Sequence, residues 1–188
     1  ALLIAIGYTM AKPHYLEILE EAICLSKDNN VDLYVKALSR TIYLQKITGN
    51  IEQMNSNIDL IKGAIDNASI SSDSIRTAYY TLYLVSFYNA DYETTKLYLN
   101  KMIELSKKDR NEIDYIDNLT MLAGQHFING EYAEMIGTLE KGLNIAQRLG
   151  MLTSCITFLL NLSSAYREIA EYEMSIIAIK KAGSVESE

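Results

Sequence analysis

Apolar residues recur every three or four positions through most of the chain, which is the spacing of one face of an α-helix. These stretches come in pairs, and a short segment with one small residue joins the two members of each pair. The pattern therefore predicts successive helix hairpins. The first helices are expected at Val35–Ile47, Ile75–Tyr88, Ile116–Ile128 and Ile156–Glu168, and the second ones at Glu52–Ala64, Glu93–Leu105, Ala133–Ala146 and Glu173–Ala182.

The small residues that join the helices repeat at a nearly constant interval. Gly49, Ala90, Gly130 and Ala170 are separated by 41, 40 and 40 residues, and each precedes a polar or acidic residue and then a large apolar one. A fixed period of this length is typical of a repeat array. A small residue suits a helix end in the left-handed conformation, which favours glycine.

The repeats divide the chain into one partial and four full units. The partial unit covers residues 1–30, with Ala1–Met10 as its first helix and Pro13 in the first turn of its second. The full units cover residues 35–70, 75–110, 116–150 and 156–188, separated by polar stretches whose residues, such as Ser72 and Asp73, are expected to cap the next helix. We interpret residues 1–188 as a single repeat domain and as part of a longer protein.

Several of these positions resemble the tetratricopeptide repeat (TPR). The third unit has Leu122-Ala123, Gly130, Tyr132 and Leu139, with His126 where an aromatic is expected, and the fourth has Leu162-Ser163, Tyr166, Ala170 and Tyr172. The resemblance implies an all-α fold, a right-handed α-solenoid of antiparallel helix hairpins. The period is near 40 residues instead of the family's usual 34. In this respect, and in residues 143–150 and 160–162, the chain resembles the arrays of bacterial signalling proteins and transcriptional regulators.

Composition narrows the classes of partner. The chain is 49% hydrophobic and 22% charged, with a net charge of −7. An acidic chain is expected to bind nucleic acid and anionic membrane surfaces poorly, because proteins bind both through clustered lysine and arginine. Two distant cysteines, Cys24 and Cys155, indicate reduced thiols in a cytoplasmic protein.

No catalytic or metal-binding motif is present in the sequence. The nucleotide-binding, zinc-protease, serine-hydrolase and EF-hand patterns are all missing. The two histidines, His14 and His126, have no Cys or His partner three or four residues on, and His126 holds a repeat position normally filled by a packed aromatic, so we assign it a structural role and expect no metal and no cofactor. An enzymatic function would have to reside in the chain without these motifs.

The tyrosines offer two interpretations. Tyr92, Tyr132 and Tyr172 hold the same repeat position, where we expect each ring to pack between helices. The helix over residues 75–88 carries five aromatic residues, which is more than one buried stripe accommodates. They are either a binding patch or additional core, and the sequence leaves both open. The five are Tyr79, Tyr80, Tyr83, Phe87 and Tyr88.

The resemblance places a concave binding groove on the first helices of the repeats. Among its inward positions are Lys46 and Thr77, and Asn161 is the best candidate for binding a peptide backbone because its amide both donates and accepts hydrogen bonds. The candidate partner-binding residues are Lys36, Arg40, Tyr43, Tyr80, Leu84, Phe87, Thr120, Phe127, Leu160, Asn161, Ser164 and Arg167.

These residues favour a non-catalytic module that binds a protein or peptide, as the sensor or scaffold part of a bacterial cytoplasmic signalling or transcriptional regulator. The alternative is an architectural array that mediates self-association of the parent protein, with a neighbouring chain filling the groove. The lysine–asparagine clamp that some family members use for a terminal carboxylate is absent, because Ser39, Tyr43, Tyr80 and Thr81 stand at those positions.

Overall fold

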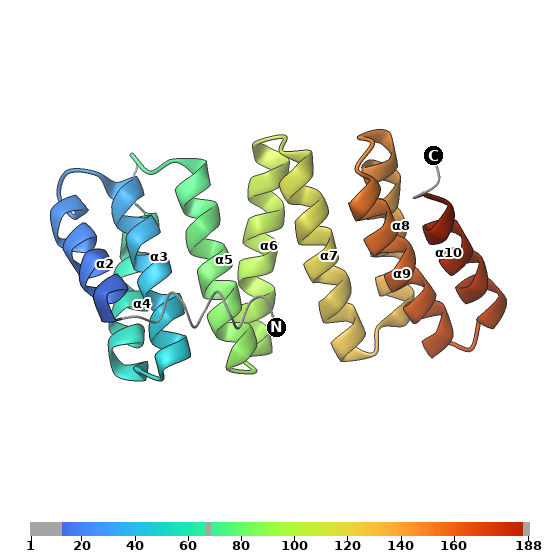
Figure 1. The fold of residues 1–188 in the computed structure, drawn as a ribbon, viewed down its shortest axis with the longest axis horizontal. Coiled ribbons are helices and arrows are strands. Elements are labelled where there is room, and N and C mark those ends of the chain that lie inside the picture. The colour runs from blue at the N-terminus through green and yellow to red at the C-terminus, as the bar shows by residue number, and fades with distance from the viewer. Residues whose placement is uncertain (1–12, 67–68, 186–188) are drawn as a thin grey trace. The chain divides into compact units, whose positions relative to one another are not determined.

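The computed structural model describes residues 13–66 and 69–185, and within these ranges all regular structure is α-helical (Figure 1). The expected helix Ala1–Met10 lies outside the described residues. The helices are α2 (Pro13–Ser26), α3 (Val31–Thr48), α4 (Ile51–Ile65), α5 (Ser72–Tyr88), α6 (Tyr92–Lys108), α7 (Glu112–Asn129), α8 (Tyr132–Arg148), α9 (Leu152–Glu168) and α10 (Tyr172–Val185).

The first helix of each hairpin begins three or four residues before the range that the apolar spacing predicts. The first turn of α5 is polar and those of α3, α7 and α9 mix polar and apolar residues, so the apolar periodicity does not detect them. Polar caps mark the starts of α3 and α7: Asn30 Oδ1 accepts from the Leu33 N–H (3.0 Å) and Asn111 Oδ1 from the Asp114 N–H (3.1 Å). Such caps satisfy N–H groups that the helix leaves without partners.

The predicted caps of α5 are wrong by one or two residues. The cap is Ser71, whose Oγ accepts from the Ser74 N–H at 3.3 Å, while Ser72 and Asp73 lie within the first turn. The first turn of a helix also favours acidic residues, so composition alone does not separate the cap from the turn that follows it.

The small residue of each hairpin has the predicted left-handed conformation. Its φ angle is +76° at Gly49, +56° at Ala90, +73° at Gly130 and +63° at Ala170. The N–H of the next residue donates to a carbonyl five positions back at every turn, as in Glu131 N–H to His126 O at 2.8 Å. This bond is the signature of the Schellman motif, which ends a helix and satisfies its last carbonyls.

Two connections between hairpins use the same geometry. Arg110 and Gly150 have φ angles of +53° and +67°. The N–H groups of Asn111 and Met151 donate to carbonyls five positions back, both at 2.9 Å. The sequence pattern did not indicate the left-handed turn at Arg110, because arginine gives no sign of a positive φ.

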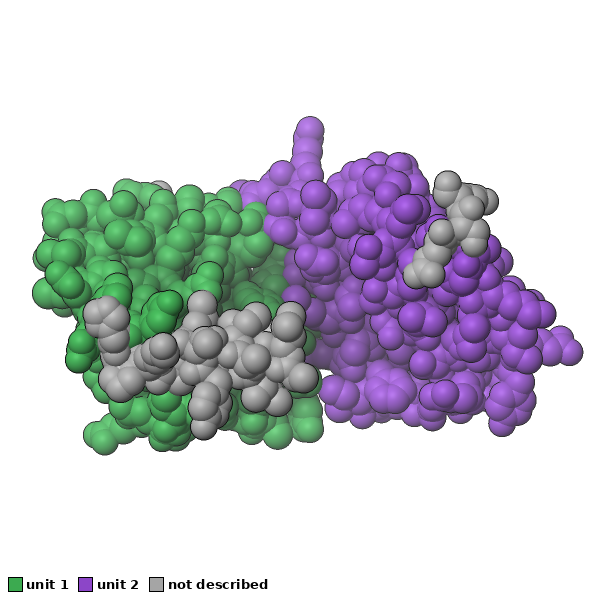
Figure 2. All heavy atoms as spheres, viewed as in Figure 1, with its two compact units in different colours: residues 1–105 green, residues 106–188 purple. Residues whose placement is uncertain are grey.

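The chain forms two compact units, residues 1–105 and 106–188 (Figure 2). In unit 1, α3 packs against α2, α4 and α5. In unit 2, α8 packs between α7 and α9, and α10 packs against α9. The single domain over residues 1–188 stays a prediction.

Each unit has its own buried apolar residues. In unit 1, Leu38 and Ile42 of α3 and Met54 and Ile61 of α4 are fully buried. In unit 2 the ring of Phe158 lies on Gly142, where an added Cβ would meet it at 2.3 Å. Glycine at this position therefore permits the close packing of α9 on α8.

The packing role predicted for the repeat tyrosines holds for one of three. Tyr132 packs against the core of unit 2 and meets Phe127 edge-on, with ring centroids 6.0 Å apart. Tyr92 and Tyr172 are 55% and 62% exposed, so the prediction is wrong for them. All three tyrosines are the first residues of their helices, so the repeat position alone does not determine whether the ring is buried.

We expect Gly130→Val to destabilise the protein. Valine at a φ of +73° is strained by about 1–3 kcal/mol, so the melting temperature should fall by a few degrees. The control is Gly137→Ala in the interior of α8, where an added Cβ meets no atom within 4 Å. Alanine favours the helix there and should leave the melting temperature unchanged or raise it. Equal melting by both variants in circular dichroism would contradict the role of the left-handed turn.

Candidate functional site: a groove between α3 and α5

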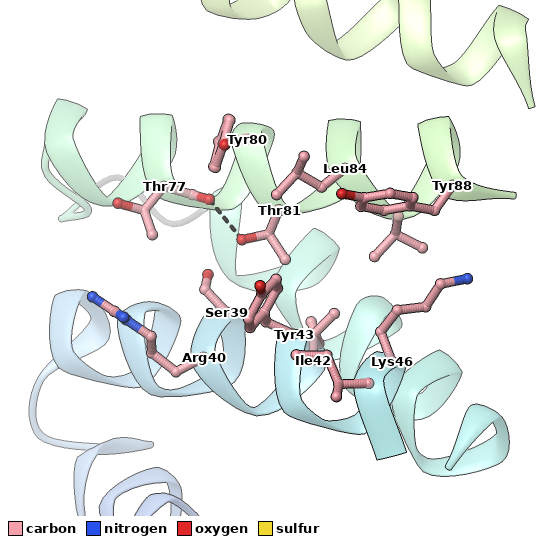
Figure 3. Close-up of a pocket in the computed structure, with 12 residues that line it drawn as sticks. Ser39, Arg40, Ile42, Tyr43, Lys46, Thr77, Tyr80, Thr81, Leu84 and Tyr88 are labelled. Atoms are coloured by element: carbon pink, nitrogen blue, oxygen red, sulfur yellow. Dashed lines mark hydrogen bonds between the residues drawn. The ribbon is translucent and has the colours of Figure 1, made fainter. Parts of the chain in front are cut away.

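Side chains of α3 and α5 face each other within unit 1 and enclose a groove of about 570 Å³ (Figure 3). Six of the positions that the sequence placed on the inward face line it: Arg40, Tyr43 and Lys46 from α3, and Thr77, Tyr80 and Leu84 from α5. Six more lining residues were not predicted as contacts: Ser39, Ile42, Ile47, Thr81, Val85 and Tyr88.

Helical spacing explains both sets. Residues three or four apart lie on one face of a helix, so 39, 43 and 46 form one row, and 77, 81, 84 and 88 form the row opposite. The missed residues stand beside the predicted ones on the same faces. Each of two helices that line a groove contributes more than one row of side chains. Including the residues three or four positions from each predicted one would therefore have found them.

Polar contacts join α3 to α5 at both ends of the groove. At the start of α3, Asp32 Oδ1 accepts from the backbone N–H of Ser71 (2.9 Å) and from its hydroxyl (2.8 Å). These bonds, with that of the Ser74 hydroxyl, lower the pKa of Asp32, the backbone N–H of Ser71 having the largest effect. At the end of α3, Lys46 Nζ donates to Asn89 Oδ1 at 2.6 Å. The spacing of the two helices is thus fixed on either side of the groove.

Lys36 contributes to this connection instead of lining the groove. Its ammonium lies 2.6 Å from Asp73 Oδ2, one turn before Thr77. The hydrogen bond from Lys36 to Asp73 raises the pKa of Lys36. Lys36 was grouped with the binding residues because the resemblance to the TPR places it, with Arg40 and Tyr43, among the inward positions of the first helix.

The groove combines an apolar lining with positive charge. Ile42 is fully buried, and the tyrosine rings at 43, 80 and 88 are 37%, 41% and 64% exposed. The only charged lining residues are Arg40 and Lys46, and within the described part of the chain Arg40 makes no ion pair. Such a surface presents aromatic and aliphatic carbon together with donors.

A buried hydroxyl in the groove lacks a hydrogen bond. Ser39 is 5% exposed, and its Oγ has no hydrogen-bond partner among the described residues. Figure 3 shows its side chain pointing from α3 toward Thr77 and Thr81 of α5. The Thr81 hydroxyl donates to the Thr77 carbonyl at 2.9 Å, so it does not serve Ser39 as a donor. An unpaired buried polar group is costly and uncommon in a native protein.

The five aromatic residues of α5 divide between the two interpretations left open by the sequence. Tyr80 and Tyr88 line the groove. Tyr79 packs against Tyr98 of α6 with centroids 6.0 Å apart, and Tyr83 is buried, which raises its pKa. Phe87 packs between Tyr83 and Tyr88, with centroids 6.0 and 5.8 Å away, and is not among the residues that line the groove.

The remaining candidates lie in unit 2. On α9, Leu160, Ser164 and Arg167 share one face, and the Ser164 hydroxyl donates to the Leu160 carbonyl at 3.2 Å. Asn161 is half-buried, and its amide makes no hydrogen bond to another described residue. On α7, Thr120 is half-buried and Phe127 is 44% exposed. A binding role for these six residues stays a prediction.

His126 contacts a carboxylate that the sequence analysis did not consider. Its Nδ1 lies 2.6 Å from Glu131 Oε2, across the turn and five residues on. This contact joins the end of α7 to the start of α8. The described residues hold no group of three or more side chains suited to binding a metal.

Among the helices in the described ranges, none has both the length and the apolar character that crossing a bilayer requires.

Comparison with known proteins gives a fold and no family. No protein-family model and no curated protein matches the chain. Two crystal structures of the kinesin light chain-like, nearly identical TPR-like repeats of Podosopora anserina, one of them a single-residue variant, each match with a TM-score of 0.73. The variant is 12% identical to this chain and the other structure 11%, and each match covers 97% of this chain and 92% of the other. The fold is that of TPR-like repeats.

A further solved structure agrees. BtubC (BKLC) from P. vanneervenii matches at a TM-score of 0.58 and 12% identity, over 90% of this chain and 87% of that one. The predicted all-α, TPR-like fold is therefore confirmed.

We expect Ser39→Ala to stabilise the protein, because it removes an unpaired buried hydroxyl and favours the helix. The free energy of unfolding should rise by about 1 kcal/mol. The matched control is Ser163→Ala in α9. Ser163 is also buried, but its Oγ lies 2.8 Å from that of Ser175, so the change leaves a buried hydroxyl unpaired. Urea unfolding should show opposite signs, and a loss of stability in Ser39→Ala would contradict this account.

Proposed function

We propose that this chain is a non-catalytic module that binds a segment of a protein or peptide, with the α3/α5 groove as a principal site. The groove carries the proposal because two helices expose three tyrosine rings, aliphatic carbon and two cations on a surface fixed at both ends. Tyrosine and arginine are enriched among the residues that dominate binding energy. The first helices of stacked hairpins are also where TPR-like arrays have room for an extended ligand.

We further propose that the module is the helical sensor or scaffold part of a bacterial signalling or transcriptional regulator in the cytoplasm. The repeat period near 40 residues and the resemblance of residues 143–150 to such arrays support this assignment. Two free cysteines, one buried and one exposed, agree with a reducing compartment.

Truncating one groove tyrosine should weaken binding without unfolding the protein. Random peptides displayed on phage are selected on the wild-type protein, and their affinities are compared with those for Tyr43→Ala by fluorescence anisotropy. Since Tyr43 stands in the middle of the groove, we expect the dissociation constant to rise at least about tenfold. Circular dichroism should show unchanged helicity.

The control for this experiment is Leu60→Ala, which truncates a similarly exposed side chain on α4. Its affinity should equal that of the wild type. If Tyr43→Ala leaves the affinity unchanged and Leu60→Ala lowers it, the peptides bind outside the groove, which would contradict the proposal. Asn161→Ala, tested beside them, reports whether unit 2 also binds peptide.

One observation favours the alternative function, self-association. Ile179 of α10 stands 40 residues after Leu139 of α8, at the same repeat position. Leu139 is fully buried, but Ile179 is 53% exposed, as is Ile176. With Tyr172, these residues form an exposed apolar stripe at helical spacing along α10.

The charges beside this stripe are self-complementary. Glu173 stands near the start of α10 and Lys180 near its end, on the same side of the stripe by helical spacing. Two α10 helices from two copies, packed antiparallel, would place each Glu173 beside the partner copy's lysine. We therefore propose a symmetric pairing through α10 as the second candidate function.

Self-association through α10 predicts a specific pattern in sedimentation velocity. Ile179→Glu should reduce the dimer, whereas Leu60→Glu should not. Lys180→Glu should weaken the dimer through repulsion, and adding Glu173→Lys should restore it, because the swapped charges match again across the pair. A wild-type chain that stays monomeric as its concentration is raised would contradict this function.

A further inference from the structure

The charge of the groove is opposite to that of the chain as a whole. The protein has 24 acidic and 17 basic residues, yet the groove lining includes Arg40 and Lys46 and no carboxylate. Lys46 donates to the neutral amide oxygen of Asn89, and Arg40 has no carboxylate partner among the described residues. The two positive charges of the lining are thus left for a ligand to compensate.

The positions of the two cations suggest what shape of ligand fits. They are six residues apart on α3, which is about 9 Å along a helix axis. Tyr43 lies between them, with Leu84 and Tyr88 opposite on α5, and Figure 3 shows Arg40 and Lys46 at opposite ends of this apolar stretch. An extended peptide covers that distance with about three residues. A large apolar side chain would therefore meet the middle of the groove, and the side chains two positions before and after it, on the same face of the peptide, would reach toward the two cations.

The unpaired hydroxyl of Ser39 is a second and independent indication of a ligand. It is buried in the wall of the groove between the same two helices, so a ligand reaches it when the neighbouring side chains move aside. A peptide backbone carries donors and acceptors at every residue, so a bound segment would supply the missing hydrogen bond. The unpaired hydroxyl therefore raises the free energy of the unbound protein, and binding removes this penalty.

We infer that the groove binds an acidic segment of a partner protein. A large apolar side chain of the segment packs against Tyr43 and Leu84, carboxylates on either side of it pair with Arg40 and Lys46, and the backbone bonds to Ser39. The inference rests on the proposed function and adds the chemistry of the partner. Carboxylate–guanidinium bonds are charge-assisted and stronger than neutral ones.

Three labelled peptides test this inference. They share a central leucine in a polar frame and differ only at the residues two positions before and after it, which are both Glu, both Gln or both Lys. In an extended chain these side chains lie on the same face as the leucine. We expect Glu to bind more tightly than Gln by about tenfold for each ion pair formed. The Lys peptide should bind most weakly, and added salt should reduce the advantage of Glu.

Reversing the charges of the groove should reverse the order. In Arg40→Glu/Lys46→Glu the Lys peptide should bind most tightly and the Glu peptide most weakly. Lys62→Glu/Lys96→Glu is the control with the same net charge, since both lysines are exposed outside the groove in unit 1. It should keep the wild-type order. Because Lys46 also bonds to Asn89, Arg40→Gln is a milder variant that removes one charge without removing an intramolecular ion pair.

The outcomes separate the inference from the proposed function. If the three peptides bind equally and Tyr43→Ala weakens all of them, the acidic partner is overturned and the groove still binds peptides. If none of them binds, and Tyr43→Ala also leaves the affinity of the display-selected peptides unchanged, both the acidic partner and the proposed function are overturned. Ser39→Ala adds a readout at the hydroxyl: it should weaken the Glu peptide about threefold to tenfold without loss of stability. An unchanged affinity would remove Ser39 from the site.

Discussion

A left-handed residue at the end of a helix is the constraint on which most of this structure depends. It recurs at Gly49, Ala90, Arg110, Gly130, Gly150 and Ala170, and a backbone bond five residues long accompanies it each time. Because this motif reverses the chain within two or three residues, consecutive helices of the same unit pack side by side. Their apolar faces are then buried by neighbours close in sequence, which is why a period in the sequence becomes a period in the fold.

The α3/α5 groove follows from this arrangement. Helices α3 and α5 are the first members of consecutive hairpins, so α4 lies between them in sequence and both pack in one unit. The contacts of Asp32 with Ser71 and of Lys46 with Asn89 fix their ends. Between those ends, the groove lining includes three partly exposed tyrosines, an arginine and a lysine. These side chains, which are not buried within the unit, form the surface that a partner would contact.

Much of this could be predicted from the sequence, and the failures have physical causes. Repeated small residues located the turns of the hairpins, and the resemblance in Gly130, Tyr132 and their equivalents indicated the fold. Helix starts were misplaced because apolar spacing is silent about polar first turns such as that after Ser71. Tyr92 and Tyr172 were assigned to packing because a repeat position does not determine exposure, which depends on neighbours. Ser39 carried no signal at all, since a serine in a helix normally bonds to a carbonyl of the preceding turn.

Stability and binding place opposite demands on the two helices of the groove. A ligand-free protein would gain from replacing Ser39 by alanine, and from pairing Arg40 with a carboxylate of its own. The structure does neither within its described residues: the hydroxyl is buried without a bond and the guanidinium has no ion pair. Elsewhere the same chain satisfies such groups, as in the contacts of Ser163 with Ser175 and of Gln45 with Asn57. Unsatisfied groups gathered at one groove, in a protein that pairs equivalent groups elsewhere, are best explained by a ligand that completes them.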